Sequence, residues 1–155
     1  MKKIRLKSEL KVRTLQSDAH AVQDQTDMMN CYFINNLNKK EADLINNELQ
    51  KKLQGYKRQD KLKNKYDDNT FITFIDLVEK IVISKLNCFY CHKKVMIIYK
   101  YVRDPIQWTL DRKDNTKGHS KDNTLICCLS CNLQRRNQNM DKFLFTKQLK
   151  IVKQP

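Results

Sequence analysis

Two Cys-x-x-Cys pairs constrain this chain more than any other feature of its sequence. Cys88 and Cys91 form the first pair, and Cys128 and Cys131 form the second. Each short loop aims two sulfurs at one point, and four thiolates suit a tetrahedral zinc ion. The alternative is four buried reduced cysteines, but unrelated core cysteines have no reason to pair at this spacing. We therefore expect all four to be ligands of a structural zinc ion.

The interval between the two pairs, residues 92–127, is longer than in a simple zinc ribbon, so it must hold structure of its own. Residues 95–102 are rich in β-branched and aromatic side chains and predict a strand, which the Asp104-Pro105 turn ends. Residues 108–112 predict a second strand and residues 124–127 a third. A helix is expected from about 129 to 139, and Cys127 is expected in the core.

The rest of the chain predicts mainly helices. Asn38 and Glu41 are spaced as a capping box, and the helix that they start is expected to end at Gly55. Residues 71–86 have apolar positions at helical spacing, with Asn69 or Thr70 as the cap, and residues 140–152 predict a short helix. The run 67–70 breaks the pattern, so we divide the chain into a basic helical extension, 1–68, and a cysteine-bearing domain, 69–155.

The first thirty residues are harder to interpret. Residues 2–13 form a basic arm that could touch phosphate, direct the protein to a nucleus or be a solvated tail. Residues 14–30 are polar and weakly patterned, so we expect them to be ordered only by contact with something else.

Charge narrows the class of partner. Lys and Arg number 31 against 17 Asp and Glu, which gives a net charge of +14 and a pI near 9.6. This favours a polyanion, and we expect nucleic acid. The sequence has no apolar run of transmembrane length and no secretory signal pattern, so we expect no membrane partner and no secretion. Metal-binding cysteines indicate a reducing compartment, the cytoplasm or nucleus, or a virion.

Three motifs together resemble a known family. LDRKDN at 110–115, GHSKDN at 118–123 and the second cysteine pair followed by Asn132 are similar to the HNH endonucleases, the ββα-metal or His-Me finger group, in their zinc-stapled form. The resemblance covers about residues 70–150. It implies an α+β fold in which a ββα-metal domain follows the helical extension, and hydrolysis of DNA phosphodiester bonds with one Mg²⁺ or Mn²⁺ ion.

The resemblance also assigns roles to residues. Asp111 and Asn132 would hold the divalent ion, since both offer hard oxygen donors, and Asn123 would orient the general base. Arg112 stands where the family usually has the His that acts as base, and arginine cannot accept a proton at neutral pH. His119 is the replacement candidate because its usual pKa of about 6.5 suits proton transfer. Asp114 is a second candidate.

Basic side chains around these motifs are expected to contact nucleic acid. They are Arg112, Lys113, Lys117, Lys121, Arg135 and Arg136. The alternative for the last two is ordinary charge on a helix surface. Three functions stay open: a metal-dependent nuclease, a binding module that kept the zinc fold and lost cleavage, and a component of a large nucleoprotein or viral assembly. In the third case, residues 1–66 would contact other proteins.

Overall fold

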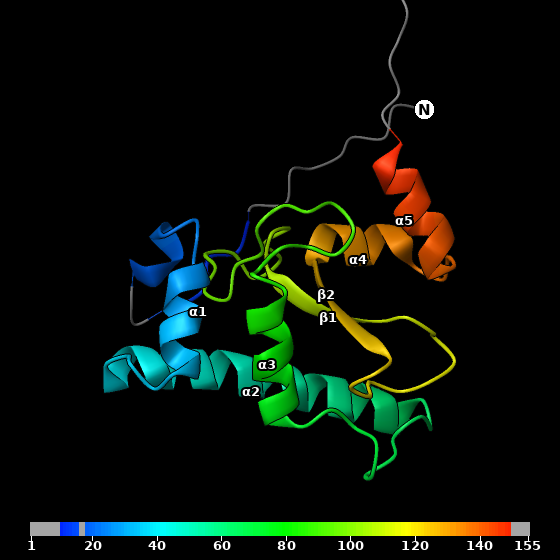
Figure 1. Cartoon of the computed structure of the whole chain (residues 1–155), viewed down its shortest axis with the longest axis horizontal. Helices are drawn as coiled ribbons and strands as arrows, with labels where there is room; N and C mark the ends of the chain where they lie inside the picture. The colour runs from blue at the N-terminus through cyan, green and yellow to red at the C-terminus, as the bar shows by residue number, and fades with distance from the viewer. Residues whose placement is uncertain (1–9, 16–17, 150–155) are drawn as a thin grey trace, which may run out of the picture.

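The computed structural model describes residues 10–15 and 18–149. In chain order its elements are a 3-10 turn η1 (Asp18–Ala21), α1 (Thr26–Phe33), α2 (Lys39–Leu62), α3 (Phe74–Ile83), β1 (Trp108–Arg112), β2 (Thr124–Cys128), α4 (Leu129–Arg135) and α5 (Met140–Gln148). The two strands form an antiparallel hairpin that lies between α4 on one side and the long helix α2 on the other (Figure 1). The chain is therefore mixed α and β, as the sequence predicts.

The hairpin and α4 form a continuous ββα unit. Trp108 pairs with Cys128 and Asp111 with Leu125, and the strand bounds agree with the predicted ones to within one residue. Helix α4 begins directly after β2, because the Cys128 side chain accepts the backbone N–H of Cys131 as an N-cap. The predicted helix to residue 139 is too long. Arg136 has a positive φ of 51° and ends α4 at Arg135.

Helix α2 supports the hairpin from the other side. Asn38 caps it by accepting the Glu41 N–H, as predicted. The prediction that it ends at Gly55 is wrong: the helix continues to Leu62, because this glycine is exposed and costs a helix interior only about 1 kcal/mol. The added turns place Tyr56 where its hydroxyl accepts the backbone N–H of Leu110 at 2.9 Å.

Helix α3 is shorter than its predicted span. Thr73, not Asn69 or Thr70, caps it by accepting the N–H of Asp76, and the helix ends at Ile83. Helix α5 starts at Met140 as predicted and ends at Gln148, and the remaining predicted residues 150–152 lie outside the described part of the chain.

The predicted strand 95–102 is wrong. Residues 95–99 are buried, but the segment forms only isolated bridges, such as Met96 with Gln107. The buried side chain of Gln25 takes the place of a neighbouring strand. Its Oε1 accepts the N–H groups of Ile97 and Ile98 at 2.8 and 3.0 Å, and its Nε2 donates to the Ile98 carbonyl at 2.8 Å. Gln25, just before α1, is thus ordered by contact with a distant part of its own chain.

The basic arm is described only from Leu10, and its residues 2–9 lie outside the described part. Where it is described, it lies along residues 100–102, with a bridge from Val12 to Tyr101. Arg13 then pairs with Glu48 on α2 at 2.6 Å. This end of the arm is therefore attached to the fold through backbone bonds and one ion pair.

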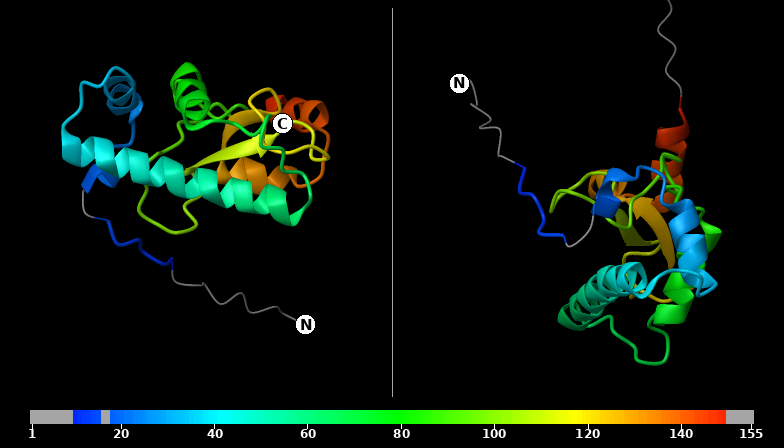
Figure 2. Two further views of the ribbon diagram at one scale, coloured as in Figure 1. Left: turned by 90° about the horizontal axis from the view of Figure 1, so that it is seen from below. Right: turned by 90° about the vertical axis from the view of Figure 1, so that its left-hand side faces the viewer.

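A single hydrophobic cluster joins the two predicted parts of the chain. It includes Met29, Ile45 and Leu49 from the extension and Trp108 and Ile126 from the hairpin. The view from below shows α2 running across the hairpin (Figure 2). Among the described residues, no helix is both long and apolar enough to cross a membrane.

Candidate metal centre and nucleic-acid interface

The first cysteine pair lies in a tight turn between α3 and the buried segment 95–99. The N–H of Cys88 donates to the Lys93 carbonyl at 2.8 Å, and the N–H of His92 donates back to the Cys88 carbonyl at 2.9 Å. His92 has a φ of 61°, and this left-handed residue turns the chain around the sulfurs. Its side chain is exposed, as expected for a residue that is not a ligand.

The second pair meets the first at the start of α4. All four sulfurs lie within 4.8 Å of one another, and Cys91 Sγ is 3.9 Å from Cys128 Sγ. Zinc–sulfur bonds of about 2.3 Å in a tetrahedron require sulfurs about 3.8 Å apart, so the cluster fits a zinc ion with little adjustment. The hydrogen bond between the Cys88 and Cys128 thiols lowers the pKa of Cys88 and raises the pKa of Cys128, so Cys88 ionises first of these two. The four cysteines could therefore hold a zinc ion, and the site is closed by protein ligands.

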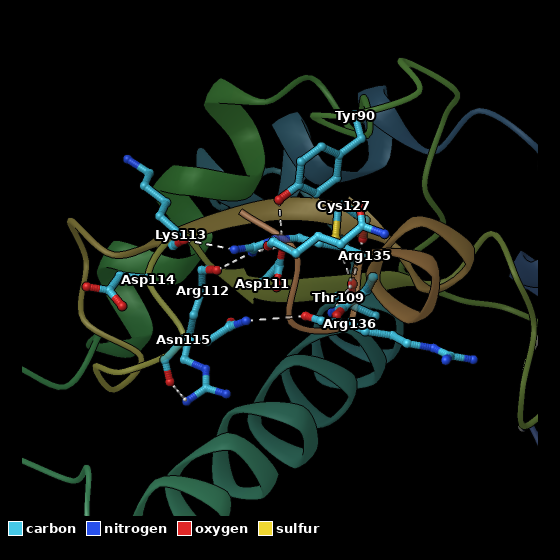
Figure 3. A network of polar contacts seen from close by, with 12 residues as sticks. Tyr90, Thr109, Asp111, Arg112, Lys113, Asp114, Asn115, Cys127, Arg135 and Arg136 are labelled. Atoms are coloured by element: carbon cyan, nitrogen blue, oxygen red, sulfur yellow. Dashed lines mark hydrogen bonds and ion pairs between the residues drawn. The ribbon is translucent and has the colours of Figure 1, made fainter. Parts of the chain in front are cut away.

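Asp111 is buried and paired within its own chain. Its Oδ2 accepts the Tyr90 hydroxyl at 2.7 Å and Arg135 Nη1 at 2.7 Å (Figure 3). Burial, followed by the bond to Asp111, raises the pKa of Tyr90, so that hydroxyl stays protonated and remains a donor. The carboxylate expected to hold a divalent ion therefore has a protein cation and a protein hydroxyl as partners.

Arg135 is 2% exposed, which differs from its expected place at a nucleic-acid surface. Besides Asp111, its guanidinium donates to the backbone carbonyls of Arg112, Lys113 and Gln138. These bonds tie the end of β1 to α4. Its neighbour Arg136 is exposed, and the Arg136 carbonyl accepts Asn115 Nδ2 at 3.2 Å.

His119 lies in a contact between the loop 113–121 and α2. Its Nδ1 is 2.6 Å from Asp60 Oδ1, and its backbone N–H donates to Asp60 Oδ2 at 2.7 Å. The ring packs on Tyr56 with centroids 4.8 Å apart. Burial lowers the pKa of His119, an effect that Asp60 opposes without cancelling. A neutral imidazole with Nδ1–H pointing at Asp60 fits this geometry.

Asn123 and Asp114 shape the same loop. Asn123 Oδ1 accepts the N–H of Asp114 at 3.0 Å, and its Nδ2 donates to the Asp114 and Gly118 carbonyls. The Asp114 carboxylate accepts both the hydroxyl and the N–H of Thr116, and these bonds lower its pKa. The side chain of Asn123 thus forms its hydrogen bonds with backbone groups of the loop.

Asn132 does reach the side of the hairpin that carries Asp111. Its Nδ2 donates to Thr109 Oγ1 at 3.1 Å. Thr109 and Asp111 are two residues apart on β1 and therefore point to the same face. The two residues expected to hold a divalent ion thus lie on one face of the hairpin, but Asn132 is bonded to Thr109 and Asp111 to Arg135 and Tyr90.

The other basic residues expected to contact nucleic acid differ in exposure and in their partners within the chain. Lys113 and Lys117 are exposed, whereas Lys121 pairs with Asp76 at 3.0 Å. Arg112 is half-buried and donates to the carbonyls of Asn115 and Lys117, so it also supports the loop (Figure 3).

Sequence reasoning missed two residues of this region. Nothing in the sequence marks Tyr90, which lies inside a cysteine pair, as a partner of Asp111. Asp60 did carry a signal: it is the single acid in the basic run 56–65, and it falls four residues after Tyr56 on the inward face of α2.

Comparisons with protein-family models, with curated proteins and with solved structures found no match. The resemblance to HNH endonucleases therefore rests on the residues and their arrangement alone.

Proposed function

We propose that this protein is a zinc-stapled nucleic-acid-binding protein that uses an HNH-like ββα unit as its binding scaffold. One observation carries the proposal. Arg135 and Tyr90 neutralise and bind the Asp111 carboxylate, the group that cleavage would need for a divalent ion. Hydrolysis also needs a base near the attacking water, and the candidate His119 is 2% exposed and bound to Asp60.

Charge supports a binding role. Lys113 and Lys117 on the loop and Arg136 after α4 are exposed, and the Arg136 carbonyl is bonded to the loop residue Asn115. Flexible cations on a rigid, metal-closed scaffold suit contacts with phosphates, which position a nucleic acid without reading its sequence. The net charge of +14 adds long-range attraction for the same partner.

Binding is tested by fluorescence anisotropy with a labelled DNA duplex, in buffer that contains zinc and no magnesium. We expect salt-dependent binding that weakens when Lys113, Lys117 and Arg136 are all changed to Gln. The matched control changes three exposed lysines elsewhere, Lys39, Lys40 and Lys142, to Gln. No binding at low salt, or equal loss in both triple variants, would refute the proposed interface.

Cleavage is the second candidate, and one observation favours it. Asn132 donates to Thr109, which shares a face of β1 with Asp111, so both residues expected to hold the ion lie on the same side of the hairpin. Nicking of supercoiled plasmid with Mg²⁺ or Mn²⁺ tests it. Omitting the added ion is the proper control, because a chelator would also remove zinc. Nicking that Asn132→Ala abolishes, in a variant of unchanged zinc content, would establish the nuclease and overturn a purely binding role.

A further inference from the structure

Helix α2 has two chemically different faces. Its inward face carries Ile45, Leu49, Leu53 and Tyr56, which belong to or pack on the core. Lys51, Gln54, Arg58 and Lys61 recur at spacings of three and four residues, so they share one other face. All four are exposed, and we call them, with the half-buried Lys57, the α2 basic stripe. Seen from below, α2 runs across the front of the domain, and no other described helix or strand covers it (Figure 2).

No acidic residue belongs to the stripe, and Glu48, three residues before Lys51, is buried and paired with Arg13. Between residues 50 and 63 the single acid is Asp60, which is 1% exposed and bound to His119. An ordinary solvated helix surface alternates charges of both signs, which attract each other at positions three or four apart. Here the like charges repel one another, so the approach of an anion would relieve that repulsion.

The neighbouring structure positions these side chains. Lys57 Nζ lies 5.4 Å and Lys61 Nζ 5.0 Å from the centre of the Tyr66 ring, both within the range of cation–π attraction. Gln54, Lys57, Arg58 and Lys61 together line a surface recess of about 270 Å³. The stripe is thus a defined surface rather than a set of unrelated side chains.

The end of α2 is joined to the loop that carries the proposed interface. Lys65 Nζ donates to the Asn115 carbonyl at 2.6 Å, and Asp60 holds His119. Gly118 also packs so closely on the Lys65 carbonyl that it leaves no room for a larger side chain. Lys113 and Lys117 therefore sit on a loop that is held against the end of α2 by these contacts.

We propose that the α2 basic stripe is a second contact surface for the phosphodiester backbone of a nucleic-acid duplex. The inference rests on the proposed nucleic-acid-binding function and adds a surface outside the ββα unit. From Lys51 to Lys61 the helix advances about 15 Å, which exceeds the spacing of successive phosphates on one strand. Neither aromatic ring near the stripe is open for base stacking: Tyr56 is turned toward Leu110, and the ring of Tyr66 lies against Phe71, with Lys57 and Lys61 over it. Contacts with phosphates of a duplex, rather than with unpaired bases, fit this chemistry.

The test changes Lys51, Arg58 and Lys61 to Gln and compares this stripe variant with the wild type and with the Lys39, Lys40 and Lys142 control. Affinity for a labelled 25-bp DNA duplex is measured from about 50 to 300 mM salt, beside an RNA duplex and the unpaired DNA strand. Each lost phosphate contact lowers the slope of log K against log salt by about 0.9, so the stripe variant should lose about 2 to 3 units of slope. Its affinity at low salt should fall at least about tenfold, and melting and zinc content should not change.

The outcomes separate this inference from the function on which it rests. Duplex binding by the wild type with no difference between stripe and control variants would overturn the stripe and leave the binding function intact. Absence of binding by the wild type would overturn both. An equal loss for the unpaired strand would overturn the assignment to a duplex, and the RNA arm shows which duplex is preferred.

Discussion

The ion pair between Asp111 and Arg135 leads to a prediction that separates a structural role for Asp111 from a catalytic one. Arg135 is 2% and Asp111 9% exposed at the side chain, so solvent screens the pair little. Changing Asp111 to Ala leaves a buried guanidinium without its counter-charge and removes the acceptor of the Tyr90 hydroxyl. Removing one partner of a buried pair costs about 3–5 kcal/mol. We expect Asp111→Ala to lose stability in that range.

The loss is large enough to measure directly. For a chain of 155 residues, each kcal/mol shifts the Tm by about 2–4 °C, so the Tm of Asp111→Ala should fall by roughly 6 to 20 °C. Urea unfolding in excess zinc gives the free energy of unfolding independently. Asp122→Ala is the control, because Asp122 is exposed and such substitutions usually change stability by no more than about 0.5 kcal/mol.

A double variant tests the cause of the loss. Asp111→Leu combined with Arg135→Met removes both charges, so it should recover part of the stability lost by Asp111→Ala. Recovery should be incomplete, because Arg135 also donates to three backbone carbonyls. If Asp111→Ala were as stable as the wild type and removed a metal-dependent nicking activity, the reasoning would be refuted, and Asp111 would be a metal ligand rather than a structural anion.

Three further predictions follow from the same structure. Chelation of zinc, or Cys131→Ser, should unfold the domain. A structural zinc site contributes about 10–16 kcal/mol, as much as the total free energy of unfolding of a typical domain, which is about 5–15 kcal/mol. An unchanged circular dichroism melt after zinc loss would contradict this. Gly118→Ala should lower the free energy of unfolding by about 1–3 kcal/mol, because its Cβ would meet the Lys65 carbonyl. Gly55→Ala has nothing within 4 Å of its Cβ and should raise that free energy by up to about 1 kcal/mol. The opposite order in urea unfolding would be inconsistent with the packing. Burial lowers the pKa of His119 from its usual 6.5, so the unfolded chain binds a proton at this imidazole more readily than the folded chain does. The contribution of the neutral His119 to stability is therefore complete above pH 6.5 and is lost as the pH falls below 6.5. The urea midpoint of the wild type should therefore fall more than that of His119→Asn between pH 7.5 and 5.5, and parallel falls would argue against it.

The parts of the fold that the sequence predicts well are those set by local rules. Two short loops fix the directions of four sulfurs, so the spacing of Cys88, Cys91, Cys128 and Cys131 is enough to bring them together. The strand 108–112 is bounded by a turn on each side, and the cap at Asn38 starts α2 at the expected residue. Within each cysteine pair, at the strand ends and at the cap, the local geometry is set by neighbouring residues.

The parts that fail depend on partners far away in sequence. Residues 95–102 have the composition of a strand, but their backbone groups are taken by the side chain of Gln25, more than seventy positions earlier. Gly55 looks like a helix end, yet Tyr56 and Asp60 beyond it bind the hairpin and the loop, and those contacts outweigh the cost of a glycine. The amino-acid composition of a segment predicts none of these long-range contacts.

Arg135 shows how a local rule could have changed the functional expectation. Cys128 and Cys131 must point inward to reach the other sulfurs, and Arg135 follows Cys131 by four residues, so it lies on the same inward side of α4. An arginine placed there needs an acid, and Asp111 is the one that β1 supplies on the facing side. The charge that a divalent ion would bring to Asp111 is thus already provided by the chain. Lys113, Lys117 and Arg136 stay exposed and are available to an external anion, and the proposed binding function rests on this division of charge.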